Sequence, residues 1–220
     1  MTETPRRRSQ AERRASTRAA LLDAALITLV KDGYANFTTR GVAERAGFSQ
    51  GTQQHYFESK AGFVVEAMRY AVQVIRDDTV RRLDISGLTT PGEQERLLDE
   101  IWRVHQSLAF KAALELWNAA RADEQLRETL RQLEREVTEA IRATSREVLS
   151  RTDADPAVLD LLDLALSAVR GLAMLAPVVP QAVLERRWIT QREHLADLLR
   201  RRVNPTRAGP GEPDASPHGH

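Results

Sequence analysis

Apolar residues recur three and four positions apart along almost the whole chain, and this spacing restricts the fold more than any other feature of the sequence. The run from Leu21 to Val30 is one example, because its leucines fall on one face of a helix. No segment shows the alternation of apolar and polar residues that is typical of a strand. Aromatic residues make up only 5% of the chain and charged residues 29%, which suits long amphipathic helices better than a sheet. The sequence therefore predicts an all-α protein.

Capping residues, glycines and prolines divide this pattern into about nine helices. Ser9 and Glu12 have the spacing of a capping box at the start of the first helix, and Gly33 is a natural stop at its end. A turn cluster at residues 87–92 follows the fourth helix, and we place a hinge between two domains just before it. The helices are predicted over residues 10–33, 39–46, 50–57, 60–83, 93–110, 111–121, 123–150, 156–179 and 181–203.

The positive charge of the chain gathers near its N-terminus, although the formal net charge is only +1. Residues 1–70 contain eleven Lys or Arg and seven Asp or Glu, and six of these arginines lie within the first twenty residues. Such a basic arm is suited to the phosphate backbone of a nucleic acid. A solvated terminal tail explains the same residues equally well.

Three classes of protein are disfavoured by what the sequence lacks. Cysteine is absent, which excludes disulfides, thiolate nucleophiles and Cys-ligated zinc. No apolar run follows the N-terminal arginines, so no signal peptide is predicted. The most apolar stretch, residues 157–179, contains three charged residues and is not predicted to span a membrane. We therefore expect a cytoplasmic protein with no membrane partner.

Two short predicted helices lie between the long first helix and the fourth. Thr38 is suited to cap the first of them, and Gly47 ends it. Small apolar contacts that let two helices cross closely are supplied by Val42, Ala43, Ala46 and Phe48. Two short helices joined by a tight glycine turn fit the helix-turn-helix pattern of DNA-binding proteins.

The same stretch resembles the signature of the TetR family of bacterial transcription regulators. The residues that match the signature in order and spacing are Gly33-Tyr34, Thr38, Val42-Ala43, Ala46-Gly47-Phe48-Ser49, Gly51, Tyr56-Phe57 and Ser59-Lys60. The match covers about residues 10–70, roughly a third of the chain. Three positions depart from it: Gly41 stands where an acidic residue often completes a capping box, and Gln53-Gln54 replace an apolar residue and a tyrosine.

The resemblance implies an N-terminal three-helix helix-turn-helix domain and a C-terminal helical domain for ligand binding and dimerisation. On this basis residues 1–8 are a flexible basic arm and residues 9–60 the DNA-binding domain. The helix over residues 60–83 links it to an effector-binding and dimerisation domain at 61–203. Residues 204–220, rich in Pro, Gly and Ser, are predicted to be a disordered tail.

The second short helix is the expected recognition helix, whose N-terminal half lies in the major groove. The candidates for contact with base edges are Gln50, Thr52, Gln53 and Gln54. Glutamine can pair with adenine through two hydrogen bonds, although any one of these glutamines can instead contact phosphate or solvent. The candidates for phosphate contacts, which set the register on DNA, are Thr39, Arg40, His55, Tyr56 and Lys60. Phe57 is expected in the core.

The resemblance also implies an effector pocket and a dimer in the C-terminal domain. Residues suited to line a mostly apolar pocket are Trp102, His105, Phe110, Leu114, Trp117 and Met174. Each of them can also be an ordinary core residue. The helix after Pro156 is apolar on nearly all sides and needs burial on more than one, so a two-fold dimer is favoured over a single intramolecular core. The candidate interface residues are Leu162, Leu166, Val169 and Trp188.

Together with these features, the resemblance implies a nucleoid-associated homodimeric repressor that a small, largely apolar effector releases from a palindromic operator. The alternative is an architectural or protein-responsive DNA-binding protein without a small ligand. We expect no enzyme, because the sequence has no nucleophile motif, no phosphate loop and no clustered acid and histidine ligands. No cofactor and no metal site are predicted.

Overall fold

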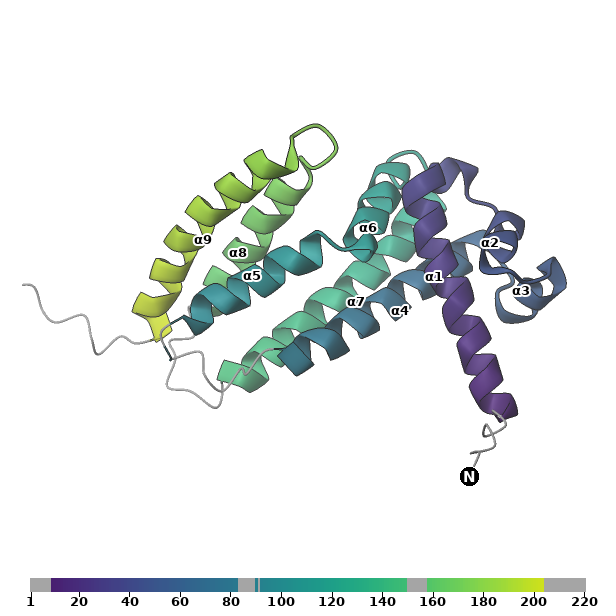
Figure 1. The fold of residues 1–220 in the computed structure, drawn as a ribbon, viewed down its shortest axis with the longest axis horizontal. Helices are drawn as coiled ribbons and strands as arrows, with labels where there is room; N and C mark the ends of the chain where they lie inside the picture. The colour runs from purple at the N-terminus through teal and green to yellow at the C-terminus, as the bar shows by residue number, and fades with distance from the viewer. Residues whose placement is uncertain (1–8, 83–89, 91, 150–157, 204–220) are drawn as a thin grey trace, which may run out of the picture. The chain divides into compact units, whose positions relative to one another are not determined.

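The computed structural model describes residues 9–82, 90, 92–149 and 158–203, and within these residues the chain is helical without strands (Figure 1). The all-α prediction is therefore confirmed. The helices are α1 (Gln10–Asn36), α2 (Thr39–Ala46), α3 (Gln50–Tyr56), α4 (Lys60–Arg82), α5 (Glu93–His105), α6 (Leu108–Ala119), α7 (Glu124–Leu149), α8 (Val158–Ala173) and α9 (Gln181–Val203). None of the described helices is long and apolar enough to cross a membrane.

Local capping chemistry explains where the first helices begin and end. The hydroxyl of Ser9 accepts from the backbone N–H of Glu12, whose carboxylate accepts from the N–H of Ser9, which completes the predicted capping box. Gly33 interrupts the regular helix as predicted, with φ 74° and ψ 165°, yet one further turn follows and α1 ends at Asn36. Thr38 caps α2 through the N–H of Gly41.

Two helix ends in the C-terminal half differ from the prediction. The break expected between residues 110 and 111 lies earlier, because Ser107 accepts from the N–H of Phe110 at 3.3 Å and starts α6 there. The helix expected to reach residue 179 ends at Ala173, and a run of turns leads to α9. The predicted turn cluster at residues 87–92 and the predicted tail lie almost wholly outside the described residues.

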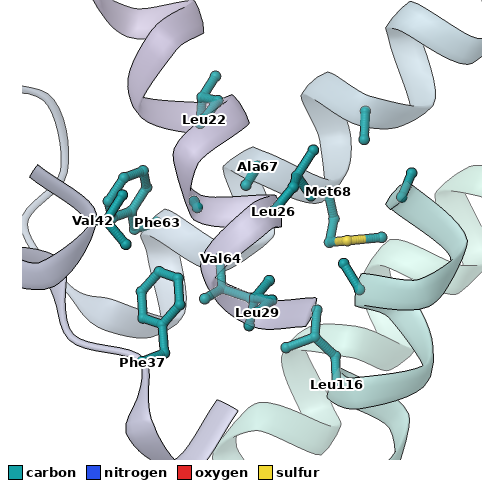
Figure 2. Packing of buried hydrophobic residues seen from close by; sticks show 14 of the residues in the cluster. Leu22, Leu26, Leu29, Phe37, Val42, Phe63, Val64, Ala67, Met68 and Leu116 are labelled. Atoms are coloured by element: carbon teal, nitrogen blue, oxygen red, sulfur yellow. The ribbon is translucent and has the colours of Figure 1, made fainter. Parts of the chain in front are cut away.

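The chain separates into two compact units. The first comprises Met1–Arg82 and Trp102–Ile141, and the second comprises Leu83–Ile101 and Arg142–His220. In the first unit α1 packs against α2, α4 and α6, and one apolar core continues from the helix-turn-helix through α4 and α6 to α7 (Figure 2). The predicted functional division near residue 60 stays a prediction.

Three phenylalanines carry this core beneath the helix-turn-helix. Phe57 stacks on Phe63 of α4 with ring centroids 4.0 Å apart, and Phe37 meets Phe63 edge-on at 5.9 Å. All three are buried, which confirms the core position predicted for Phe57. Phe37, before α2, and Phe57, directly after α3, both contact Phe63 of α4. The helix-turn-helix is therefore held on α4 at both of its ends.

The second unit is built on a hairpin of α8 and α9, which pack along one another (Figure 1). Its buried side chains include Val169 and Leu172 of α8 and Leu184 of α9. Asp99 of α5 accepts from the indole N–H of Trp188 at 3.0 Å and from Arg192 at 2.7 Å. These two bonds attach the first part of α5 to α9 within this unit.

Candidate nucleic-acid interface

The turn between α2 and α3 has the geometry of a helix-turn-helix. Gly47, directly after α2, has φ 75°, a left-handed conformation that costs glycine little. The N–H groups of Gly47 and Phe48 return to the carbonyls of Glu44 and Ala43, at 3.1 and 2.9 Å, which is a Schellman motif. Ser49 then caps α3 through the N–H of Thr52, so the chain turns within three residues.

The four candidates for base contacts do not share one environment. Gln50 and Gln54 are exposed on α3. Thr52 is half-buried, and its hydroxyl lies 2.9 Å from that of Ser49. Two exposed glutamines four positions apart therefore lie on neighbouring turns of the same short helix.

The buried position of Gln53 contradicts the contact with base edges that was predicted for it. It is only 1% exposed, and its side-chain amide donates to the carbonyl of Phe57 at 3.0 Å. Its side-chain oxygen is buried without a hydrogen-bond partner. The physical reason is the helix period, which turns Gln53 to the inner side of α3, toward the residue that follows the helix. The departure from the family pattern, an amide where an apolar residue is common, was the signal for a core position.

The candidates for phosphate contacts also differ in availability. Thr39 is half-buried at the start of α2, and Arg40 is exposed but forms an ion pair with Glu44 at 2.9 Å. His55 is exposed beside the ring of Tyr56, with centroids 5.4 Å apart. The hydroxyl of Tyr56 donates to the carbonyl of Arg14 in α1 at 3.4 Å.

Lys60 differs most from its predicted role as a phosphate contact. Its ammonium donates to the carbonyl of Tyr34 at 2.6 Å and lies 4.2 Å from the centroid of the Tyr34 ring. Burial lowers the pKa of Lys60, and the carboxylate of Asp123 opposes this effect. The first residue of α4 is thus fastened to the last turn of α1, because this turn presents both a carbonyl and an aromatic face.

A chain of ion pairs across three helices was not visible in the sequence. Arg18 of α1 pairs with Glu66 of α4, and Glu66 pairs with Arg69 at 3.2 Å. Arg69 in turn reaches Glu136 of α7 through two nitrogens, each 3.1 Å from a carboxylate oxygen. The partners lie 48 and 67 positions apart in the sequence, so no spacing rule predicts them.

The candidates for the effector pocket are partly brought together. Trp102, His105 and Phe110 are buried. The ring of His105 lies 4.6 Å from that of Phe110, and Phe110 meets Trp117 edge-on at 5.9 Å, so these three form an aromatic cluster in the first unit. Leu114 and Trp117 are half-buried on α6. No group of three metal-ligating side chains occurs in the part of the chain that the structure describes.

Met174 does not fit a pocket wall. Its side chain is 54% exposed just after the end of α8. It lies in the second unit, whereas the aromatic cluster belongs to the first. The end of the apolar helix was predicted six residues too late, and this error placed Met174 inside the helix. It stands instead in the turn that leads to α9.

Two of the four candidates for a dimer interface are buried within the second unit itself. Val169 and Trp188 are 0% and 4% exposed, so they form the core between the helices of this unit. Leu162 and Leu166 are half-buried. The exposed apolar side chains on α8, α9 and the turn between them were not singled out from the sequence; they are Leu164, Leu175, Val178, Ile189 and Leu198. A helix that is apolar on all sides gives no indication of which side faces the partner.

Comparison with known proteins relates this geometry to one family. The family model described as bacterial regulatory proteins, tetR family, matches residues 21–67. The HTH-type transcriptional regulator CymR of Pseudomonas putida is 33% identical over 178 residues, which is 78% of this chain and 84% of CymR. The similarity therefore extends well beyond the helix-turn-helix.

Two solved structures share the fold at lower sequence identity. A TetR transcription regulator from Haloarcula marismortui has a TM-score of 0.61 and 18% identity, and the match covers 84% of this chain and 98% of that one. A transcriptional regulator from Saccharomonospora viridis, solved in complex with choline, has a TM-score of 0.58 and 20% identity. That match covers 84% of this chain and 96% of the other.

Proposed function

Because this chain belongs to the TetR family of bacterial regulatory proteins and is a transcriptional regulator, we propose that it is a homodimeric repressor released from a palindromic operator by a small effector. The observation that carries the proposal is the presentation of α3. This helix is capped by Ser49 and held on α4 through Phe57 and Phe63, and it exposes Gln50 and Gln54. A rigidly held helix with exposed amides is suited to the major groove.

We assign the recognition of bases to Gln50 and Gln54. Thr52, which is half-buried, remains a third candidate. Each glutamine can accept from and donate to the edge of an adenine, and a good pair of this kind contributes roughly 1–3 kcal/mol of discrimination against a wrong base. Thr39, Arg40, His55 and Tyr56 remain proposed phosphate contacts. Gln53 and Lys60 are left out of both groups because the side chain of Gln53 is buried and the ammonium of Lys60 is directed to the carbonyl of Tyr34.

The exposed apolar side chains of α8 and α9 support the dimer. Leu164 is 51% exposed and Ile189 46% exposed, on helices whose opposite sides already form the core of the second unit. In a dimer with a two-fold axis beside such a hairpin, the same apolar surface of each subunit packs against its copy in the other subunit. Two recognition helices related by this axis then require an operator with two inverted half-sites.

The aromatic cluster of His105, Phe110 and Trp117 supports a largely apolar effector with few polar groups. These rings belong to the same unit as α4, the helix on which the helix-turn-helix is held. An effector releases DNA only if it binds the DNA-incompetent conformation more tightly than the competent one. We propose that its binding tilts α4 and moves the two recognition helices away from the spacing of the half-sites.

Binding of the full chain to the duplex upstream of its own coding sequence tests the proposal. We expect affinity at physiological salt to exceed that for a scrambled duplex by about a thousandfold or more. Gln50→Ala and Gln54→Ala are expected to reduce this ratio, whereas Gln53→Leu is expected to preserve it. Equal and strongly salt-dependent binding to both duplexes would favour the architectural alternative. A folded dimer that binds neither duplex would refute the proposed function.

The operator found in this way also tests the effector. Small apolar molecules are added to the preformed complex, and release is followed by fluorescence anisotropy of the labelled duplex. We expect an active compound to release wild-type protein and to act more weakly on Phe110→Ala. A compound that releases both proteins equally would place its site away from the aromatic cluster.

A further inference from the structure

We infer that Arg13 and Arg14, on the first turns of α1, form the principal phosphate-binding site beside the recognition helix. The inference rests on the proposed DNA binding and assigns the larger share of its electrostatic part to residues outside the helix-turn-helix. The basis for it is a difference between basic side chains: some already have a partner within the protein, whereas others have none among the described residues.

Between the start of α2 and the start of α4, the arginine and lysine side chains already have partners within the protein. Arg40 pairs with Glu44 at 2.9 Å and Arg45 with Asp32 at 2.8 Å, so each pair carries no net charge. Lys60 is directed to the carbonyl of Tyr34. When DNA approaches, the carboxylates stay beside these arginines and repel the phosphates, which weakens the attraction.

Arg13 and Arg14 are in a different state. Both are exposed on α1, and no carboxylate of the described residues forms an ion pair with either of them. A charge that is not balanced within the protein attracts phosphate and displaces the counterions bound to DNA. These two guanidinium groups are therefore suited to bind the DNA backbone without first breaking an interaction.

Two contacts place this turn of α1 beside the end of α3. The hydroxyl of Tyr56, the last residue of α3, donates to the carbonyl of Arg14 at 3.4 Å. The guanidinium of Arg18, one turn further along α1, lies 5.8 Å from the centroid of the Phe57 ring. Figure 1 shows the N-terminal half of α1 extending past α2 and α3. The turn of α1 that carries the two unpaired charges thus lies beside the end of the recognition helix within the same unit.

The test compares two variants of the full chain that lose the same charge. Arg13→Gln/Arg14→Gln removes the proposed site, and Lys31→Gln/Lys111→Gln removes two exposed charges elsewhere in the first unit. Affinity for the upstream duplex and for the scrambled duplex is measured across salt concentrations. Circular dichroism verifies that both variants remain helical.

We expect Arg13→Gln/Arg14→Gln to lower the slope of log affinity against log salt by about 0.9 for each contact, or about 1.8 for each bound chain. The loss should be equal on both duplexes, so their ratio of affinities is preserved. The lysine variant should keep the wild-type slope, and Arg13→Lys/Arg14→Lys should keep most of it, because the charges remain.

Two results would overturn the inference alone. An unchanged slope in Arg13→Gln/Arg14→Gln, with wild-type protein that binds its operator, would show that these arginines do not meet phosphate. An equal fall in the lysine variant would show a general effect of net charge. Failure of wild-type protein to bind either duplex would instead refute the proposed function, and the inference with it.

Discussion

At the scale of single residues, the helix-turn-helix depends on a few backbone and side-chain positions with one function each. Gly47 supplies the left-handed turn, Ser49 restarts the chain as α3, and Lys60 ties the end of the motif to Tyr34. None of the three is needed to touch DNA. Their effect on binding is indirect, because they hold α3 in one orientation.

Gly47→Ala is expected to lower the free energy of unfolding by about 1–2 kcal/mol, because an L-residue with a Cβ is strained at φ 75°. Apart from the two neighbouring residues in the chain, no atom lies within 4 Å of the position that the new Cβ would take, so the effect arises from the backbone conformation. Urea denaturation measures it. Gly47→Asn is the control and should lose less, since asparagine tolerates this conformation. Equal losses for Ala and Asn would contradict the explanation.

Lys60→Met is expected to reduce the affinity for operator while leaving its salt dependence unchanged. The substitution keeps the apolar stem but removes the donor to the carbonyl of Tyr34, so α4 is held less firmly at its first residue. A lysine that bound phosphate would instead lower the slope by about 0.9 for each bound chain. Measuring affinity at several salt concentrations separates these two roles.

At the scale of helices, the ends and the connections between helices matter more than the length of each helix. Ser107 is the clearest case, because one hydroxyl separates α5 from α6 and thereby directs the aromatic residues on either side of the break. Arg69 is a second case, since it links α4 to α7 through Glu136.

Ser107→Ala is expected to lower the free energy of unfolding by about 1 kcal/mol, the usual effect of removing a serine N-cap. The N–H of Phe110 then loses its partner at the start of α6. Thermal denaturation is the measurement. Ser167→Ala, at an exposed position inside α8, provides the control and should cause no loss. A similar loss at both positions would argue against the cap.

The link between α4 and α7 is expected to weaken in acid. The guanidinium of Arg69 lowers the pKa of Glu136, so the folded state binds this proton less readily than the unfolded state does. The stabilisation is therefore present above the ordinary glutamate pKa and is lost as pH falls through the lowered one. Wild type should have the higher Tm near neutral pH, and its advantage over Glu136→Gln should vanish in acid. A pH-independent difference would contradict this account.

At the scale of the whole molecule, the exposed apolar surface of α8 and α9 is what a second subunit would cover. Leu164 and Ile189 are about half exposed, although both are large and apolar. Isolated apolar residues on a surface are ordinary, but several of them on one hairpin favour an interface.

Leu164→Glu/Ile189→Glu is expected to convert the proposed dimer to monomer in sedimentation experiments and to abolish tight operator binding. Each charge would be buried without a partner, at a cost of about 3 kcal/mol or more, which raises the dimer Kd more than about a hundredfold. Val74→Glu, at a 48% exposed position on α4, is the matched control and should remain dimeric. A dimer that persists in the double variant would exclude this surface as the interface.

What the sequence alone determined lies within a few positions along the chain. Ser9 and Thr38 cap helices, and Gly47 turns the chain, because these effects act over four residues or fewer. The all-α class, the order of the helices and the helix-turn-helix followed from such local rules and from the period of apolar residues. The resemblance of the same stretch to a known family supplied its function.

Only the tertiary structure decided which side chains remain free to act. Gln53 and Gln54 are neighbours of identical chemistry, yet Gln53 is buried with its amide on the carbonyl of Phe57 and Gln54 is exposed. Lys60 is directed inward by a carbonyl 26 positions away, and Trp188 is engaged by Asp99, 89 positions away. Such contacts depend on how distant segments meet when the core closes. A polar or aromatic residue is therefore recognisable from the sequence, but its availability is decided by the fold.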